Sequence, residues 1–539
     1  MANVPTSYLP RLARALGVVR VTPNRSVETA GDYVDVEFPK AVGAAGVWAN
    51  GITGDGVTVA FLDSGIDPTF PTLRLDNRFL AYYDAIGDEL YEPPHLFQSP
   101  RDPSGHGTHV AGVVGNSFYE PWDEEYRGIA PEANLVAVRV LDETGVGSYA
   151  DVLQGLNWVV ENKDVYNIRV LNISMYAIPV APYWADPYNL AVMAAWQAGI
   201  VVVASAGNSG PAPLSIGVPG NTPYIITVGA FTDNYTPDDF GDDYLPPFSA
   251  TGPTLDAFVK PDLIAPGAHM ISLMGYNTDL SQQHPENRVN GRYYRMAGTS
   301  MSAASVSGVV ALMLSADPSL TPDQVKYRLT MTARPQFSEY TGEAAYSIWE
   351  QGAGRVWAPD AVLSDLVGEA NQGMDLDADL AGTVHYQGWT YYDPETGEFK
   401  IYGSGYDSWA GGYDSWAGGY DSWAGGTTNW SGDFSSWIDG YDSWAGGYNS
   451  WAGGYDSWAG GYDSWAGGYD SWAGGYESWA GGYSSWAGGY DSWAGYESWA
   501  GYESWAGGVG DPLWAEAFAT LQNVPDGASG VGIGSWVED

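Results

Sequence analysis

The chain has 539 residues, 45% of them hydrophobic, and its 65 acidic and 21 basic side chains give a formal charge of −44. So negative a field repels nucleic acid, which excludes a polyanion-binding protein. The sequence holds no cysteine, which excludes a disulfide framework and a thiolate metal site, and its length predicts more than one domain.

The first patterned segment is a predicted strand that ends at an acidic side chain. Residues 57–62 form a nearly continuous apolar run rich in β-branched side chains, typical of a buried parallel strand, and Asp63 follows it. Catalytic groups of parallel α/β sheets gather at that end of the strands. Further on, Gly105 and Gly107 allow a tight turn around His106, and residues 108–114 predict a helix that starts there.

The middle of the chain alternates between strand and helix patterns. Residues 127–174 predict a strand, a helix and a strand, as in a βαβ unit. Residues 189–204 are apolar enough to resemble a membrane span, but Gln197 and the Ala-Gly-Asn that follows interrupt the required length. We therefore expect a core helix broken at Gly199 and followed by a strand, and no membrane span.

A second apolar helix is predicted over residues 301–314, directly after Gly298, Thr299 and Ser300. Its first turn would present Ser300 together with free backbone N–H groups. A serine hydroxyl is a poor nucleophile until an imidazole takes its proton and a carboxylate holds that imidazole in the right tautomer. Asp63, His106 and Ser300 fit these three roles, in the chain order Asp, His, Ser.

Four short stretches carry a family resemblance: VTVAFLDSG ending at Gly65, GHGTHVAG over 105–112, SAGNSG over 205–210 and AGTSMSAASVSG over 297–308. They resemble the subtilase (subtilisin-family, S8) serine peptidases, and the stretch 127–174 is most similar to the AprX-like branch. The resemblance covers roughly residues 30–365. It implies a three-layer α/β fold with a mostly parallel sheet, and a serine endopeptidase that acts through an acyl-enzyme on protein or peptide substrates.

The resemblance also implies roles for individual residues. Asp63, His106 and Ser300 would be catalytic, Asn208 would hold the oxyanion, and the neighbouring His109 would be a packed core residue. The substrate backbone would be bound by three segments: Gly145, Val146 and Gly147; Ser174, Met175 and Tyr176; and Ser205, Ala206 and Gly207. No cofactor would be required and no metal would belong to the site, while a structural Ca²⁺ stays an open alternative.

Two departures from the family pattern concern specificity and packing. Met175-Tyr176-Ala177 stands where the family usually has Leu-Gly-Gly, so a bulky ring replaces a glycine that lines the S1 pocket. The usual Ala-x-Pro-His after the nucleophile's methionine is replaced by residues 302–305, Ser-Ala-Ala-Ser. We expect this second change to alter helix packing rather than chemistry.

The N-terminal region predicts processing. Residues 1–16 lack the apolar core of a signal peptide. Residues 9–27 resemble the last strands of an inhibitory propeptide, so we assign residues 1–30 to a propeptide remnant, removed near residues 27–32, and residues 31–365 to the peptidase domain. The resemblance implies secretion by a bacterium, with the chain's own propeptide as an inhibitor.

Residues 366–404 are expected to form an acidic linker and a hairpin. Asp375, Asp377 and Asp379 alternate as in a calcium loop, but the glycine and distal glutamate of an EF-hand are missing, so a solvated acidic turn is favoured. The following segment predicts a β-hairpin with its turn at residues 394–397.

The C-terminal part is a repeat. From Trp409 to Trp493 a tryptophan occurs at every seventh residue in YDSWAGG-like units, and Trp499 and Trp505 follow at six. Paired glycines argue against a helix, which leaves a β-solenoid-like array, favoured by the persistent register, or a flexible chain. We assign residues 405–508 to this repeat, with a C-terminal segment over 509–539. Its Tyr, Trp and Asp side chains suit binding to a glycan, a surface or itself, and its carboxylates suit Ca²⁺.

Overall fold

The computed structural model describes residues 38–117, 126–237, 240–337, 344–393, 398–401 and 531–532. The chain divides into two compact units, Met1–Asp35 and Val36–Asp539, and every described residue belongs to the second. The expected propeptide remnant over residues 1–30 and the tryptophan repeat over residues 405–508 lie outside the described residues.

A sheet of eight strands forms the centre of the described part, in the order β3-β2-β4-β1-β6-β7-β8-β9. Every neighbouring pair is parallel except β2 and β3. Its strands are β1 (Thr58–Asp63), β2 (Phe79–Asp84), β3 (Glu89–Tyr91), β4 (Asn134–Arg139), β6 (Ile168–Ile173), β7 (Val201–Ser205), β8 (Ile226–Phe231) and β9 (Leu263–Pro266). β1, β7, β8 and β9 are buried along their whole length, which explains their runs of apolar residues.

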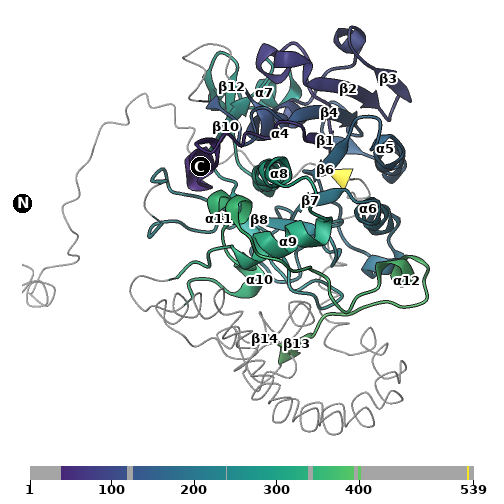
Figure 1. Ribbon diagram of the computed structural model, residues 1–539, viewed down its shortest axis with the longest axis vertical. Coiled ribbons are helices and arrows are strands. Elements are labelled where there is room, and N and C mark those ends of the chain that lie inside the picture. The colour runs from purple at the N-terminus through teal and green to yellow at the C-terminus, as the bar shows by residue number, and fades with distance from the viewer. Residues whose placement is uncertain are drawn as a thin grey trace, which may run out of the picture. The chain divides into compact units, whose positions relative to one another are not determined.

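Helices cover both faces of this sheet (Figure 1). The helices α4 (His106–Gly115) and α8 (Thr299–Ala316) pack together on one face, and α5 (Tyr149–Asn162) and α6 (Pro187–Gln197) pack on the other. The predicted βαβ unit is β4-α5-β6, with β1 inserted between its two strands. These layers confirm the predicted three-layer, mostly parallel α/β fold.

The two apolar segments in the sequence are core helices. The expected break at Gly199 lies between α6 and β7. α8 has the length and hydropathy of a membrane span, but 89% of it is buried inside the fold. Because α8 is enclosed on all sides, it needs no polar face.

Smaller elements complete the described part. A second sheet has the order β10-β12-β11, with β10 (Met270–Leu273), β11 (Arg288–Asn290) and β12 (Tyr293–Met296). The two strands of the predicted hairpin are β13 (Thr390–Asp393) and β14 (Glu398–Ile401), which pair antiparallel, while its expected turn over residues 394–397 lies outside the described residues. β5 (Val146–Gly147) pairs with β15 (Val531–Gly532). The remaining α-helices are α2 (Phe38–Ala41), α3 (Ala44–Trp48), α7 (Asp279–Gln283), α9 (Pro322–Met331), α10 (Ile348–Gln351), α11 (Ala358–Leu363) and α12 (Leu376–Leu380).

The acidic stretch after residue 366 differs from the expected solvated turn. Asp375 caps α12 by accepting from Ala378 N–H, while Asp379 is only 1% exposed. Asp379 accepts hydrogen bonds from the hydroxyls of Tyr183, at 2.6 Å, and Tyr224, at 2.8 Å. The expectation of a solvated turn is therefore wrong for Asp379, because two distant tyrosines satisfy its carboxylate in the interior.

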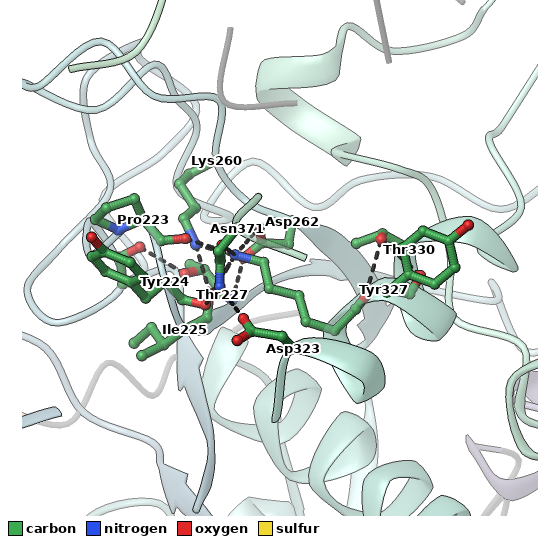
Figure 2. Close-up of polar contacts among 12 residues, drawn as sticks. Pro223, Tyr224, Ile225, Thr227, Lys260, Asp262, Asp323, Tyr327, Thr330 and Asn371 are labelled. Carbon is green, nitrogen blue, oxygen red and sulfur yellow. Dashed lines mark hydrogen bonds and ion pairs between the residues drawn. The ribbon is translucent and has the colours of Figure 1, made fainter. Parts of the chain in front are cut away.

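A buried ionic cluster lies where the loop before β8 meets the loop before β9 and the helix α9 (Figure 2). Lys260 Nζ lies 2.6 Å from Asp262 Oδ2 and donates to Ile225 O at 2.8 Å. Lys326 Nζ lies 3.2 Å from Asp262 Oδ1 and donates to Pro223 O at 2.6 Å. The two ammonium groups thus bind one carboxylate and the backbone of one loop, although all three side chains are at most 2% exposed.

Burial and charge act in opposite directions within this cluster. Burial lowers the pKa of Lys260 to about 7, although Asp262 favours its charged form. Burial alone would raise the pKa of Asp262, but the two ammonium groups bring it below its ordinary value. Each charge is therefore tolerated in the interior only because its partners are present.

Candidate active site

Asp63 ends β1 with a fully buried carboxylate. Its Oδ1 accepts from the N–H of Ser64 at 2.7 Å and faces His106 Nδ1 at 2.8 Å. A carboxylate held in this way accepts the Nδ1 proton and leaves Nε2 of the ring unprotonated.

His106 is the first residue of α4 and is also fully buried. Gly105 before it has φ +94°, which favours glycine, and a Cβ placed on Gly107 would lie 2.1 Å from Gly65 O. The two glycines therefore let α4 begin close against the end of β1. Among the described residues, His106 Nε2 has no hydrogen-bond partner, so it is open to a proton from a nucleophile.

A second buried carboxylate, Asp102, supports this turn. Asp102 accepts from Gly105 N–H at 2.8 Å, from Thr108 N–H at 2.7 Å and from the Ser64 hydroxyl at 2.8 Å. Burial raises the pKa of Asp102 to about 6, although these hydrogen bonds favour the charged form. Sequence reasoning missed this residue, because an Asp three residues before the N-cap glycine matches no standard capping pattern.

Ser300 lies in the first turn of α8, 1% exposed. Its hydroxyl donates to Ser174 O at 3.0 Å, and the Ser174 hydroxyl donates to Ser300 O at 2.8 Å. These reciprocal bonds fix the start of α8 to the residue that follows β6. Because α4 and α8 pack against each other, the first turn of each helix lies on the same face of the sheet.

Asn208 is hydrogen-bonded to Thr299, the residue before Ser300. Its Oδ1 accepts from Thr299 N–H at 2.9 Å and from the Thr299 hydroxyl at 2.8 Å. This fixes the amide plane, and Asn208 Nδ2 is buried with no hydrogen-bond partner in the part of the chain that is described. An unpaired buried donor is costly, so Asn208 Nδ2 is available to an acceptor that enters beside the start of α8.

The predicted substrate-binding residues flank this centre. Ser174 contacts Ser300 directly, Met175 is fully buried and Tyr176 is half-buried. Ser205 ends β7, and Gly207 N–H donates to Thr299 Oγ1 at 3.2 Å.

Gly145, Val146 and Gly147 form the β5 region, where Val146 is 49% exposed. β5 pairs with β15 and belongs to no larger sheet in the described residues. It is therefore a short edge strand next to the sheet rather than part of it.

His109, one turn after His106, is a core residue as predicted. Its Nε2 lies 3.0 Å from Tyr294 O, and burial lowers its pKa to about 3. Across the described residues, no group of three or more His, Asp or Glu side chains is arranged to hold a metal ion.

Known proteins are similar to this chain over the part that carries the site. The sequence profile of the Subtilase family matches residues 54–374. The serine protease AprX of Bacillus subtilis (strain 168) is 37% identical over 329 residues, which are 60% of this chain and 71% of AprX. Subtilisin E of the same organism is 32% identical over 308 residues, which are 56% of this chain and 66% of subtilisin E.

A similar solved structure is that of fervidolysin from Fervidobacterium pennivorans, described as a keratinolytic enzyme related to subtilisin. It matches with a TM-score of 0.49 and 25% sequence identity, over 62% of this chain and 46% of fervidolysin. The match thus spans less than half of that protein.

Proposed function

Because the chain belongs to the subtilase family of serine endopeptidases, as its motifs predicted, we propose that it hydrolyses peptide bonds of proteins through an acyl-enzyme on Ser300. In the first step Ser300 Oγ attacks the substrate carbonyl carbon and its proton passes to His106 Nε2. Asp63 accepts the Nδ1 proton of the same ring and stabilises the imidazolium.

The attacked carbonyl oxygen becomes an oxyanion. In this proposal Asn208 Nδ2 and the backbone N–H of Ser300 donate to it, and each such donor contributes about 3–4 kcal/mol in related subtilisins. The imidazolium then protonates the leaving amine as the peptide C–N bond breaks. A water molecule, deprotonated by His106, attacks the acyl group and releases the carboxylic acid and free Ser300.

One observation supports this assignment more than any other. Two buried nitrogen atoms without partners in the described structure, His106 Nε2 and Asn208 Nδ2, belong to the residues that a serine nucleophile at position 300 requires. The 2.8 Å contact of His106 with Asp63 gives the first of them the tautomer that accepts a proton. We extend the proposal to an extracellular enzyme, in line with the resemblance described above.

A fluorophosphonate probe tests the proposal. The probe should phosphonylate Ser300, identified by peptide mass spectrometry, with loss of fluoride, and labelling should stop casein hydrolysis. Ser300→Ala should remain unlabelled and inactive, whereas Ser319→Ala, at an exposed serine, should label normally. Labelling of another residue, or casein hydrolysis by Ser300→Ala, would reject the assignment.

A further inference from the structure

Three backbone segments, together called the enclosure, are bonded to one another beside the start of α8. The first leaves Ser174, the second runs through Ala206 and Asn208, and the third is residues 216–218. Ala177 and Val218 exchange N–H···O bonds of 2.9 and 2.8 Å, and Gly217 N–H donates to Ala206 O at 2.9 Å. The segments are thus bonded to one another, and two of them touch the first turn of α8.

In the proposed function this enclosure receives the side chain of the attacked residue. If the substrate carbonyl meets Ser300 Oγ and Asn208 Nδ2, the side chain on its acyl side, called P1, points between the segments that carry Ser174 and Asn208. Gly207 and Gly217 leave room there, since neither adds a side chain.

Tyr176 fills that room. A Cβ placed on Gly217 would lie 2.8 Å from Tyr176 Cδ2, and one on Gly207 would lie 3.5 Å from the same atom. The ring therefore lies over both glycines, and its hydroxyl reaches Ser209 Oγ at 3.3 Å. It crosses the enclosure from the first segment to the residue after Asn208.

We propose that Tyr176 closes the P1 pocket and restricts the enzyme to cleavage after small residues such as Gly, Ala and Ser. The proposal rests on the proposed function, because it names the substrate class of the same site. A P1 phenylalanine would overlap the tyrosine ring, whereas a methyl group would pack against it. Differences in pocket volume of this kind change kcat/KM by about tenfold or more.

Four-residue peptide anilides that differ only at P1 test this. For the full chain, kcat/KM should be at least about tenfold higher with P1 Ala than with P1 Phe. Tyr176→Gly should raise kcat/KM for P1 Phe enough to reverse this order. Tyr176→Phe, which keeps the ring and loses only the hydroxyl, should keep the preference for Ala.

The outcomes separate the two claims. If the chain cleaves none of the peptides and a fluorophosphonate does not label Ser300, the proposed function itself fails. If it cleaves the peptides but prefers P1 Phe, or if Tyr176→Gly leaves the Ala/Phe ratio unchanged, only the pocket proposal is overturned.

A separate observation concerns β5, the predicted substrate-binding edge. Val531 pairs with Gly147 and Gly532 with Val146, in antiparallel register. Val531 and Gly532 lie 384 and 386 positions along the chain from Gly147 and Val146, respectively. The strand that meets β5 is therefore contributed by the far end of the same chain.

From this pairing we infer that the C-terminal strand β15 competes with substrate for β5. The N–H of Asp142 donates to Val146 O at 2.8 Å and the Asp142 carboxylate accepts from Val146 N–H at 3.1 Å, which occupies one side of β5. The strand therefore has one open side and can pair with one extended segment at a time. A tethered segment competes at high effective concentration without needing high affinity. The inference depends on the proposed function, because β5 matters only if substrate binds there.

Proline and alanine variants of the full chain test this competition. Val531→Pro combined with Gly532→Pro removes both backbone donors of β15, and should lower KM for a long peptide substrate several-fold with kcat unchanged. Val531→Ala with Gly532→Ala keeps the donors and should leave KM as it was. Intact-mass measurement must show that residue 539 is still present in each protein.

A small ester substrate, too short to reach β5, distinguishes a failure of the proposed function from a failure of the competition proposal. Its hydrolysis should be equal in all three proteins, and loss of ester hydrolysis everywhere would reject the proposed function. Normal ester hydrolysis with an unchanged KM for the long peptide in the proline variant would overturn the competition.

Discussion

At the scale of residues, two side chains of the proposed centre share one feature: one polar atom of each is held by a hydrogen bond, and a nitrogen atom of each is unpaired among the described residues. Asp63 holds His106 through Nδ1, Thr299 holds Asn208 through Oδ1, and the opposite nitrogen atoms have no partner among the described residues. The Ser300 hydroxyl donates to Ser174 O in this structure. In the proposed mechanism this hydroxyl donates to His106 instead, and hydrogen bonds in active sites commonly tighten on substrate binding.

Asp102 offers a prediction at this scale. Its two oxygens accept from Gly105, Thr108 and Ser64, so the amide of Asp102→Asn must place N–H groups against at least one of these donors. At pH 8 we expect the free energy of unfolding to fall by about 1–3 kcal/mol, and kcat to fall while KM changes little. Urea unfolding and peptide kinetics measure both.

The sign of the pH dependence follows from the raised pKa of Asp102. The folded state keeps the proton up to about pH 6, so the stability from this proton is complete below the ordinary pKa near 3.8 and is lost as pH rises through 6. Because the amide does not titrate, Asp102→Asn should therefore destabilise more at pH 5 than at pH 8. Asp164→Asn, at a side chain 89% exposed, is the control, and an equal effect from both variants would contradict the role given to Asp102.

At the scale of elements, the burial of α4 changes the protonation of His109, which lies on that helix. Burial lowers the pKa of His109 to about 3, while the unfolded chain takes up this proton near pH 6.5. The stability that neutral His109 contributes is complete above pH 6.5 and is lost as pH falls from there toward 3.

His109→Gln should flatten this acid loss. Glutamine can still donate to Tyr294 O but does not titrate, so the free energy of unfolding should fall less between pH 6.5 and 4 than in the parent chain. Urea titrations at several pH values measure the slope. His95→Gln, at an exposed histidine, should keep the parent slope, and a His109→Gln slope that matches the parent would refute the prediction.

The buried ionic cluster, where the loops before β8 and β9 meet α9, gives a second prediction at this scale. Lys326→Met keeps most of the unbranched side chain but removes the donor to Pro223 O and one of the two charges beside Asp262. Breaking a buried ion pair in this way costs about 3–5 kcal/mol. Thermal and urea unfolding should show this loss. The matched control Lys163→Met, at a surface pair with Asp164, should cost at most about 1 kcal/mol, and a comparable loss in the control would contradict the account.

At the scale of the whole molecule, sequence patterns predict what is local. The apolar run before Asp63, the glycines around His106 and the helix after Ser300 each depend on neighbouring residues, and the structure has them as β1, α4 and α8. The hairpin β13–β14 follows from its own turn sequence in the same way. The resemblance to the subtilases adds the joint position of these elements.

Partners that lie far apart along the chain escape such reasoning. Asp379 is buried because Tyr183 and Tyr224 reach it, and Lys326 because the loop at Pro223 does. The spacing of residues in the sequence does not predict these contacts, because they depend on how helices α9 and α12 pack against the rest of the fold. The pairing of β15 with β5 is a third case, because a strand of two residues has no periodicity to detect.

A crystal structure of the full chain inactivated by diisopropyl fluorophosphate tests the central claim most directly. The account predicts phosphorus bonded to Ser300 Oγ, a phosphoryl oxygen within hydrogen-bonding distance of Asn208 Nδ2 and Ser300 N, and His106 Nε2 turned toward the adduct. An adduct on another side chain, or a phosphoryl oxygen directed away from Asn208, would contradict it.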